Sequence, residues 1–246
     1  MTHSIDELSL ADWRRQMADL YAEVRRLATT DPGTALAHWR RVREHLFRTH
    51  PDSPVLRANR AAFVARHFPA DPAQRFEVVV TPAWGEDGGA QVSGLSAAMP
   101  GGAPSDVRPI SFLAPSPTAA LGAGRFLELP TSSGGGMTLR RIGWVEVPFP
   151  AGTRRLAVYW MEGYAGGLFL PFRDATNGTE TYGAGRYLID AAKSADLGGD
   201  VGRGTVILDF NFAYQPSCAF DPRWACPLAP RENWLDIQVR AGERMI

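Results

Sequence analysis

The side chains of this chain that could do chemistry gather between residues 162 and 243, among aromatic residues, glycines and prolines. Three carboxylates, Glu162, Asp190 and Asp209, could move a proton, because partial burial raises the pKa of an acid into the range that general acid–base catalysis uses. Cys218 adds a thiol that could act as a nucleophile. We predict these four as the catalytic residues of a site that holds no metal.

The setting of each carboxylate depends on its strand. Glu162 continues an apolar face formed by Leu156, Val158 and Trp160, so in that register it is partly buried. If the strand ends one residue before Glu162, its carboxylate lies in water instead. Asp209 shares one face of a predicted strand, 205–212, with an amide two residues later. That face is either exposed to solvent or has a polar end that enters a pocket.

Two arginines could hold an anion, because a guanidinium binds a carboxylate or phosphate through two parallel hydrogen bonds. Arg186 is four residues from Asp190, so the two can also pair with each other on a strand or a helix. The glycines just before Arg186 indicate that backbone closely approaches a ligand or another chain segment. Arg173 precedes a predicted Asn177-Gly178 turn, where binding residues are common. The predicted substrate-binding residues are Arg173, Asp174, Tyr182, Arg186 and Asn211.

The cysteines and the single lysine each leave alternatives open. Cys218 and Cys226 cannot complete a tetrahedral zinc site, because no histidine follows His67. They are buried inert thiols, a nucleophile activated by arginine, or a disulfide that closes the loop between them. Lys193 is the only lysine of the chain. It is either an ordinary surface residue or an amine that binds an anion or forms a Schiff base.

Amphipathic helices are predicted at the N-terminus. Apolar residues recur at spacings of three and four after Ser9, where a capping box with Asp12 predicts the helix start. Asp31-Pro32 predicts the start of a second helix, which ends before Pro51. A third, shorter helix is predicted over 57–67. The pair could form the surface of a homodimer, but we expect it to pack on the rest of the chain.

The remainder reads as short strands separated by turn residues, without long intervening helices. This favours an antiparallel arrangement. We predict an α+β fold in which an N-terminal helical pair, residues 1–70, packs on a mainly antiparallel β-barrel or sandwich, residues 71–246, as one integrated unit. Loops are expected at 82–105 and 132–136. The predicted strands are 76–80, 125–129, 139–147, 156–161, 168–172, 205–212 and 235–240.

Composition narrows the partners. The 26 basic residues balance 26 acidic ones, and no basic stripe is present, so nucleic acid and membrane are poor partners. The chain has no apolar run of membrane-spanning length and starts without a secretory signal pattern, which predicts a cytoplasmic location. The motifs of P-loop kinases, zincins, serine hydrolases and Rossmann dehydrogenases are absent, and nothing in the sequence requires a cofactor.

Motifs along most of the chain resemble one known family. The N-terminal motifs are Trp13-Arg14, Phe47-Arg48 and Ser53-Pro54, and the C-terminal ones are Phe169–Asp174, Thr181–Leu188, Leu208–Asn211, Pro216–Phe220, Cys226–Pro230 and Ala241–Glu243. With these motifs the chain resembles the bacterial and archaeal family known as domain of unknown function 1684. As the name of the family records, this resemblance implies no established activity.

We expect an enzyme that acts on a small polar, anionic metabolite by carboxylate acid–base chemistry, as a hydrolase, lyase or isomerase without an organic cofactor. One alternative is a non-catalytic module that binds a small ligand in the same pocket. Another is a structural protein, in which the polar motifs are hydrogen-bond networks that fix the fold. The first two require the predicted side chains to converge on a cavity, whereas the third requires ion pairs that are closed upon themselves.

Overall fold

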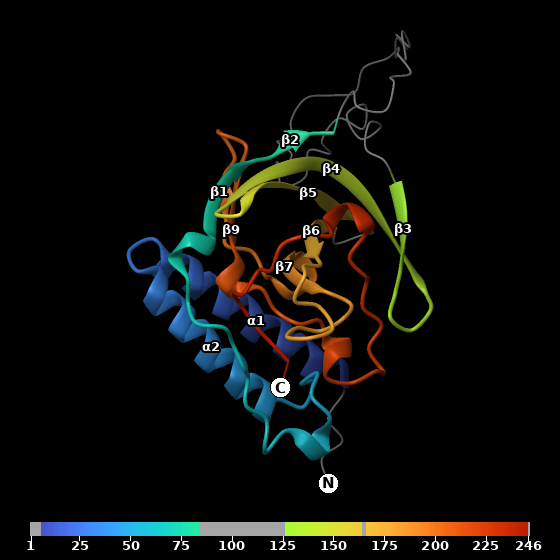
Figure 1. Ribbon diagram of the computed structural model, residues 1–246. Coiled ribbons are helices and arrows are strands. Elements are labelled where there is room, and N and C mark those ends of the chain that lie inside the picture. Colours follow the sequence, from blue (N-terminus) through green and yellow to red (C-terminus); the bar gives the residue numbers. More distant parts are fainter. Residues whose placement is uncertain (1–5, 84–125, 164–165, 246) are drawn as a thin grey trace, which may run out of the picture.

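The structure is a computed structural model, and it describes residues 6–83, 126–163 and 166–245 (Figure 1). This part of the chain contains two N-terminal helices and two antiparallel sheets, so the protein is α+β, as predicted. The predicted loop 82–105 lies, beyond its first two residues, outside the described residues. No helix in the described ranges is both long enough and apolar enough to cross a membrane.

Helix α1 spans Asp6–Ala28 and helix α2 spans Pro32–Thr49. The side chain of Asp31 accepts the backbone N–H groups of Gly33 and Thr34 at 2.9 and 3.1 Å, which confirms the predicted start of α2. The predicted start of the first helix is wrong, because Ser9 lies inside α1. Acidic residues occupy the first turn of α1, where they favour helix formation through the helix dipole.

The predicted helix over 57–67 is also wrong, since only a 3-10 turn, Arg57–Asn59, forms there. Arg60 explains the difference. Its guanidinium donates to the carbonyls of His50, Ser53 and Val55 at 2.9 to 3.1 Å, which holds the segment in an irregular path. A side chain that satisfies carbonyls from neighbouring turns stabilises a loop that helix periodicity alone does not reveal.

The larger sheet has the strand order β2-β4-β5-β6-β7, and β3 also pairs with β4. The smaller sheet has the order β1-β9-β8, and every named pair of strands is antiparallel. Among the described strands the larger sheet does not close into a barrel. The strands are β1 Arg75–Val79, β2 Thr81–Pro82, β3 Phe126–Pro130, β4 Gly136–Phe149, β5 Gly152–Met161, β6 Gly167–Phe172, β7 Arg186–Asp190, β8 Gly199–Asp200 and β9 Thr205–Asp209.

Two predicted strands differ from the structure, and three strands, β2, β7 and β8, were not predicted. Strand β9 stops at Asp209, whose side chain accepts the Asn211 N–H and so begins a 3-10 turn over Phe210–Phe212. The predicted strand 235–240 is irregular, because the N–H of Val239 bonds to the Asp174 side chain at 2.7 Å instead of to a strand. Strand β7, which carries two of the predicted site residues, was missed.

Two clusters of buried apolar side chains hold these layers together. One lies between the sheets and contains Val78 and Leu208 from the smaller sheet with Val145, Val158 and Leu170 from the larger one. Its partners come from strands far apart in the sequence, so the two sheets share a single core.

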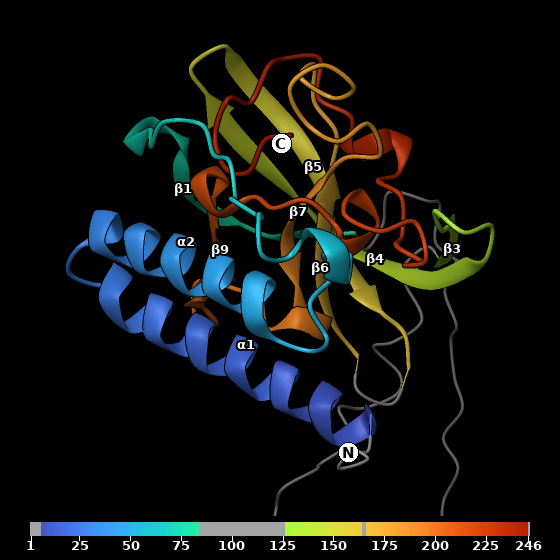
Figure 2. The same ribbon diagram turned by 90° about the horizontal axis from the view of Figure 1, so that it is seen from below.

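The second cluster joins the helices to the strands. Trp39 of α2 is fully buried, and its ring meets that of Phe212 edge to face at a centroid distance of 5.4 Å. Figure 2 shows α1 and α2 side by side along one side of β6, β7 and β9, and Phe169, Tyr187 and Ile207 of those strands pack in this cluster. The helical pair therefore packs on the sheets. Ile207, on the face of β9 that also carries Asp209, thus packs against the helical cluster, whereas Thr205 on the same face is only half-buried.

Candidate functional site

A cavity of about 260 Å³, which we call the Lys193 cavity, lies between the helices and the sheets. This volume lies just below the range of roughly 300 to 1,000 Å³ that is typical of ligand pockets, so the cavity suits only a small ligand. Its wall is mainly apolar and aromatic. The aromatic lining residues are Trp13, Phe47, Phe169, Tyr187, Tyr214 and Trp224, and the charged ones are Arg14, Arg43, Asp52, Asp190 and Lys193.

The end of β7 brings a carboxylate and an ammonium group to this cavity. Asp190 is the last residue of β7, and its Oδ1 accepts the N–H of Ala192 at 3.1 Å, which begins a 3-10 turn over Ala191–Lys193. Its Oδ2 accepts the hydroxyl of Tyr214 at 2.7 Å. Burial, together with the charge of Asp190, holds the pKa of Tyr214 well above its ordinary value, so this hydroxyl stays a donor.

Lys193 has hydrogen-bonding capacity that the described residues do not use. Its Nζ lies 3.7 Å from Asp190 Oδ2, which is longer than a hydrogen bond. It lies 5.7 and 5.5 Å from the ring centroids of Tyr187 and Tyr214, and its side chain is 25% exposed. An ammonium has three donors and no acceptor. An anion in the cavity could therefore reach donors that the fold leaves free.

Arg43, another cation of the cavity, is already engaged. Its Nε and one terminal nitrogen donate to the two carboxylate oxygens of Glu243 at 2.6 and 3.2 Å, and both side chains are buried. Its guanidinium also lies over the ring of Tyr214, 4.7 Å from the centroid. Glu243 therefore holds Arg43 in the cavity wall beside Tyr214, whereas Lys193 makes no hydrogen bond to a described residue.

A β-bulge decides which predicted residues reach the cavity. Between β6 and β7 the register shifts, so that Tyr187 lies opposite Pro171 while Ile189 lies opposite Leu170. The extra residue, Leu188, reverses the alternation of side chains along β7. Arg186 and Asp190 consequently do not meet, and the predicted pairing between them is wrong.

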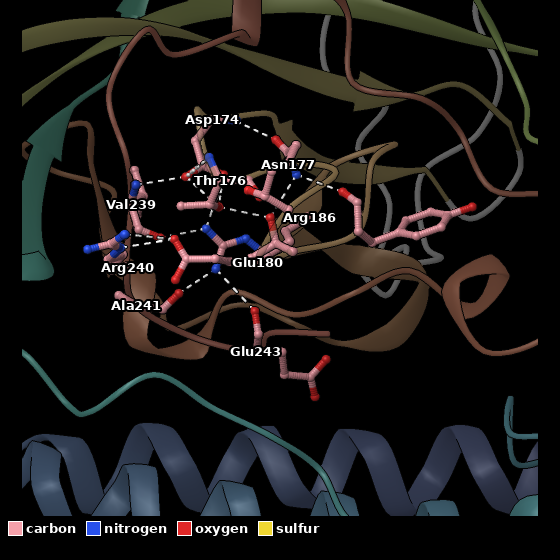
Figure 3. Close-up of polar contacts among 12 residues, drawn as sticks. Asp174, Thr176, Asn177, Glu180, Arg186, Val239, Arg240, Ala241 and Glu243 are labelled. Atoms are coloured by element: carbon pink, nitrogen blue, oxygen red, sulfur yellow. Dashed lines mark hydrogen bonds and ion pairs between the residues drawn. The ribbon is translucent and has the colours of Figure 1, made fainter. Parts of the chain in front are cut away.

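Arg186 pairs with Asp174 instead, inside a closed network (Figure 3). Its guanidinium is fully buried and donates to Asp174 at 3.3 Å and to the carbonyls of Val239, Ala241 and Glu243. Only its Nε lacks a partner among the described residues. Burial lowers the pKa of Arg186, but the carboxylate and the carbonyls compensate the charge. An anion has no access to this group, which ties the chain terminus to the sheet.

Asp174 completes that network on the other side. Its oxygens accept the hydroxyl of Thr176 and the N–H of Val239, while Asn177 Oδ1 accepts the N–H of Asp174 at 2.5 Å. The predicted turn at Asn177-Gly178 is thus part of a compact loop and not a two-residue hairpin.

Asp209 and Asn211 form a separate structural cluster. Asp209 accepts from Arg75 at 3.2 Å and from the backbone and side chain of Asn211. Asn211 exchanges two hydrogen bonds with the backbone of Asp71, at 2.9 and 2.8 Å. The amide and the carboxylate therefore join β9 to the segment before β1, and neither lines the Lys193 cavity.

Glu162 and Arg173 lie apart from this cavity as well. Strand β5 ends at Met161, so Glu162 is exposed and pairs with Arg140 at 2.9 Å, as the second of its two predicted settings describes. Arg173 stacks on the ring of Trp234, 4.2 Å from the centroid. The glycine motif before Arg186 serves close contact within the chain, because a Cβ at Gly185 would lie 2.5 Å from the carbonyl oxygen of Phe172.

The two cysteines are free, buried thiols in contact with each other. The N–H of Cys218 donates to the sulfur of Cys226 at 3.3 Å. The Cys226 thiol lowers the pKa of Cys218 to about 6, helped by the hydroxyls of Ser132 and Tyr182. Burial raises the pKa of Tyr182 to about 12, as does its hydrogen bond to Cys218. Hydroxyl and thiol donors, and not an arginine, thus polarise Cys218.

Among the predicted site residues, Asp190 alone lines the Lys193 cavity. Cys218 does not line it, but it contacts Cys226, which does. Lys193 had been singled out as the only lysine, whereas Arg43, Tyr187 and Tyr214 were missed. Their shared location depends on the bulge in β7 and on the return of the C-terminal segment to β7, where Tyr214 bridges to Tyr187. The described residues include no group of three His, Cys, Asp or Glu side chains placed to hold a metal ion.

The fold and the cavity define a class: an α+β protein with a mixed aromatic and charged cavity where its helices meet its sheets. The family model described as "Protein of unknown function (DUF1684)" matches residues 111–244, so the chain belongs to this family, as its motifs predicted. The fold is similar to the solution NMR structure of an uncharacterized protein from Haloarcula marismortui, with a TM-score of 0.54 and 27% identity over 88% of this chain and 95% of that chain. A search of curated proteins found no match.

Proposed function

We propose that this protein binds a small organic anion with an apolar body in the Lys193 cavity. The observation that carries the proposal is the ammonium of Lys193, which makes no hydrogen bond within the described residues and faces an aromatic cavity. The rings of Trp13, Tyr187 and Trp224 provide apolar surface for the body of the ligand. The ammonium of Lys193 would donate hydrogen bonds to the carboxylate or phosphate group of the ligand. In this partly desolvated setting a charged hydrogen bond is strong.

A second candidate function is acid–base catalysis on the same ligand, which would make the protein a hydrolase, lyase or isomerase without an organic cofactor. Asp190 favours it, because this carboxylate lines the cavity between a tyrosine hydroxyl and an ammonium. The catalytic group would then be Asp190 alone among the predicted acids, since Glu162 and Asp209 lie elsewhere. We further infer that the two sheets, which share one core, form a sandwich.

The test uses three molecules with one body and different charge: phenylbutyrate, phenylbutanol and phenylbutylamine. Calorimetric titration of the full chain should show the carboxylate binding at least about tenfold more tightly than the alcohol, which corresponds to ~1.4 kcal/mol. The amine should bind most weakly, because its positive charge is repelled by the ammonium of Lys193. Equal affinity for all three, or preference for the amine, would overturn the proposal. A Lys193→Gln variant should remove the preference for the carboxylate while leaving the affinity for the alcohol unchanged.

A further inference from the structure

A second hollow, of about 350 Å³, lies near the end of β3, where Arg173 and the segment 228–234 meet. It shares no lining residue with the Lys193 cavity. Trp234 lines it and is 46% exposed, whereas most large aromatic residues in the described ranges are buried. An exposed indole beside a hollow is a common feature of ligand-binding surfaces.

The indole is held in place by the fold. Its Nε1 donates to the carbonyl of Ala229 at 3.0 Å. Its backbone lies beside that of Arg173, which donates to Asn233 O at 2.9 Å and accepts from Leu235 N at 2.8 Å. The ring therefore presents a fixed surface, and a ligand that contacts it need not order it first.

Two guanidinium groups lie over this one ring. The centre of the Arg173 guanidinium lies 4.2 Å from the centroid of Trp234, and that of Arg231 lies 5.5 Å from it. Stacking uses the flat face of a guanidinium and leaves the N–H groups in its plane free for hydrogen bonds. Neither arginine has a carboxylate partner or a side-chain hydrogen bond within the described parts of the chain. Two like charges thus lie over one ring, and no carboxylate of the described residues pairs with either.

The carboxylates nearest in sequence are engaged elsewhere. Asp174 pairs with Arg186, and Glu232 accepts from Arg141 and from the hydroxyl of Tyr159. Asp236 pairs with Arg154 at 2.5 Å. Each acid that flanks the hollow in sequence thus compensates a different arginine, and the positive charge of Arg173 and Arg231 remains.

We propose that Arg173, Trp234 and Arg231 form a second binding site, separate from the Lys193 cavity, for a small oxyanion that carries two or more negative charges. Carboxylate and phosphate oxygens share the geometry that two guanidinium forks recognise. A multivalent anion can bridge both forks and relieve their mutual repulsion, whereas a monovalent ion relieves only part of it.

The experiment follows the indole N–H signal of Trp234 by NMR, assigned through a Trp234→Phe variant. Citrate and inorganic phosphate are titrated into the full chain, with sodium chloride at matched ionic strength as the control. We expect a saturable shift with citrate, phosphate or both, and none with chloride. Citrate alone would identify a polycarboxylate ligand, and phosphate alone an organic phosphate. No saturable shift below about 10 mM, or the same shift with chloride, would overturn the proposal.

Substitutions then test which residues bind the anion. Arg231→Gln changes an exposed side chain, so it should leave the fold intact and weaken binding at least about fivefold, and adding Arg173→Gln should abolish it. Lys193→Gln should leave this affinity unchanged, which separates this site from the one in the Lys193 cavity. Arg240→Gln, an exposed arginine paired with Glu180, is the matched control for charge. Unchanged citrate and phosphate affinity in the double variant would contradict the assignment.

Discussion

Two cations near the opposite ends of β7 show how differently the same fold uses positive charge. Arg186, at the start of the strand, is fully buried and faces three backbone carbonyls and the carboxylate of Asp174. Lys193, three residues past its end, is 25% exposed, has one carboxylate at 3.7 Å and faces a cavity. Arg186 belongs to a closed structural network, whereas the ammonium of Lys193 is accessible to a ligand in the cavity.

The difference is one of unused hydrogen-bonding capacity and not of residue type or motif density. Arg186 belongs to the motif-rich segment Thr181–Leu188, yet most of its donors are satisfied within the fold. Lys193 lies outside that segment, and its donors remain free among the described residues. A polar motif can thus serve the fold alone, and a ligand site is better sought where burial and unsatisfied donors coincide.

Replacing Arg186 should have the largest effect, and it should act on stability. Arg186→Met leaves Asp174 without its charge partner and leaves the carbonyls of Val239 and Ala241 unsatisfied in the core. Breaking a buried ion pair in this way costs about 3–5 kcal/mol. We expect a loss of that size in the free energy of unfolding measured in urea, or failure of the variant to fold.

The matched control is Arg240→Met, which removes an exposed ion pair with Glu180 beside the same network. Its cost should stay within about 0.5 kcal/mol. If the two variants lost equal stability, Arg186 would not be the anchor that the comparison requires.

Replacing Lys193 should affect binding and spare stability. Lys193→Gln removes the ammonium but keeps a side chain of similar length, so the free energy of unfolding should change by no more than about 0.5 kcal/mol. The affinity for phenylbutyrate, measured by calorimetry, should fall about tenfold. A large loss of stability with unchanged affinity would make Lys193 a structural residue like Arg186, and the contrast between the two would disappear.

Replacing Asp190 should raise the affinity for phenylbutyrate, by a smaller factor than the loss expected for Lys193→Gln. Asp190→Asn can still accept the hydroxyl of Tyr214, but it removes the negative charge beside Lys193. Phenylbutyrate should then bind about threefold more tightly, which is the scale of a partly screened ion pair. If the protein is also an enzyme, the same variant should lose turnover of its substrate while retaining that affinity. Weaker binding of the anion would show that the carboxylate itself contacts the ligand.

The smallest effect concerns Cys218, behind the cavity wall. Because its pKa is lowered to about 6, its thiolate is present above that pH and is lost as the pH falls through it. The rate at which methyl methanethiosulfonate modifies Cys218, followed by mass spectrometry, should rise with a midpoint near pH 6. Tyr182→Phe removes a donor to the sulfur and should move that midpoint upward. A rate that rises only near pH 9 in the unmodified chain would show an ordinary thiol.

The sequence was sufficient for the elements whose signals are local. The capping residue Asp31, the amphipathic period of the helices and the short runs between turn residues at β4 to β6 led to the correct elements there. It failed where hydrogen bonds from a side chain to the backbone override the local pattern. The Arg60 side chain replaces a predicted helix with a loop, and Asp174 captures the N–H of Val239 in a predicted strand.

The candidate site was harder to predict, for two geometric reasons. Strict alternation puts Arg186 and Asp190 on one face of a strand, but the bulge at Leu188 separates them and aligns Asp190 with Tyr187 on the cavity side. The residue types of Tyr187–Asp190 do not predict this bulge. The uniqueness of Lys193 was visible in the sequence, but Tyr214, which lies beside it in the cavity wall, comes from a segment that reaches β7 only in the folded chain.

The most direct test of the central claim uses the fact that Lys193 is the only lysine of the chain. With lysine labelled selectively at its terminal carbon, the NMR spectrum contains a single lysine signal, which needs no assignment. We predict that phenylbutyrate shifts this signal in a saturable way, that phenylbutanol shifts it far less, and that the Arg231→Gln variant shows the same response. A lysine signal that stays unchanged while phenylbutyrate binds elsewhere would contradict the claim that this ammonium is the open, ligand-binding cation of the fold.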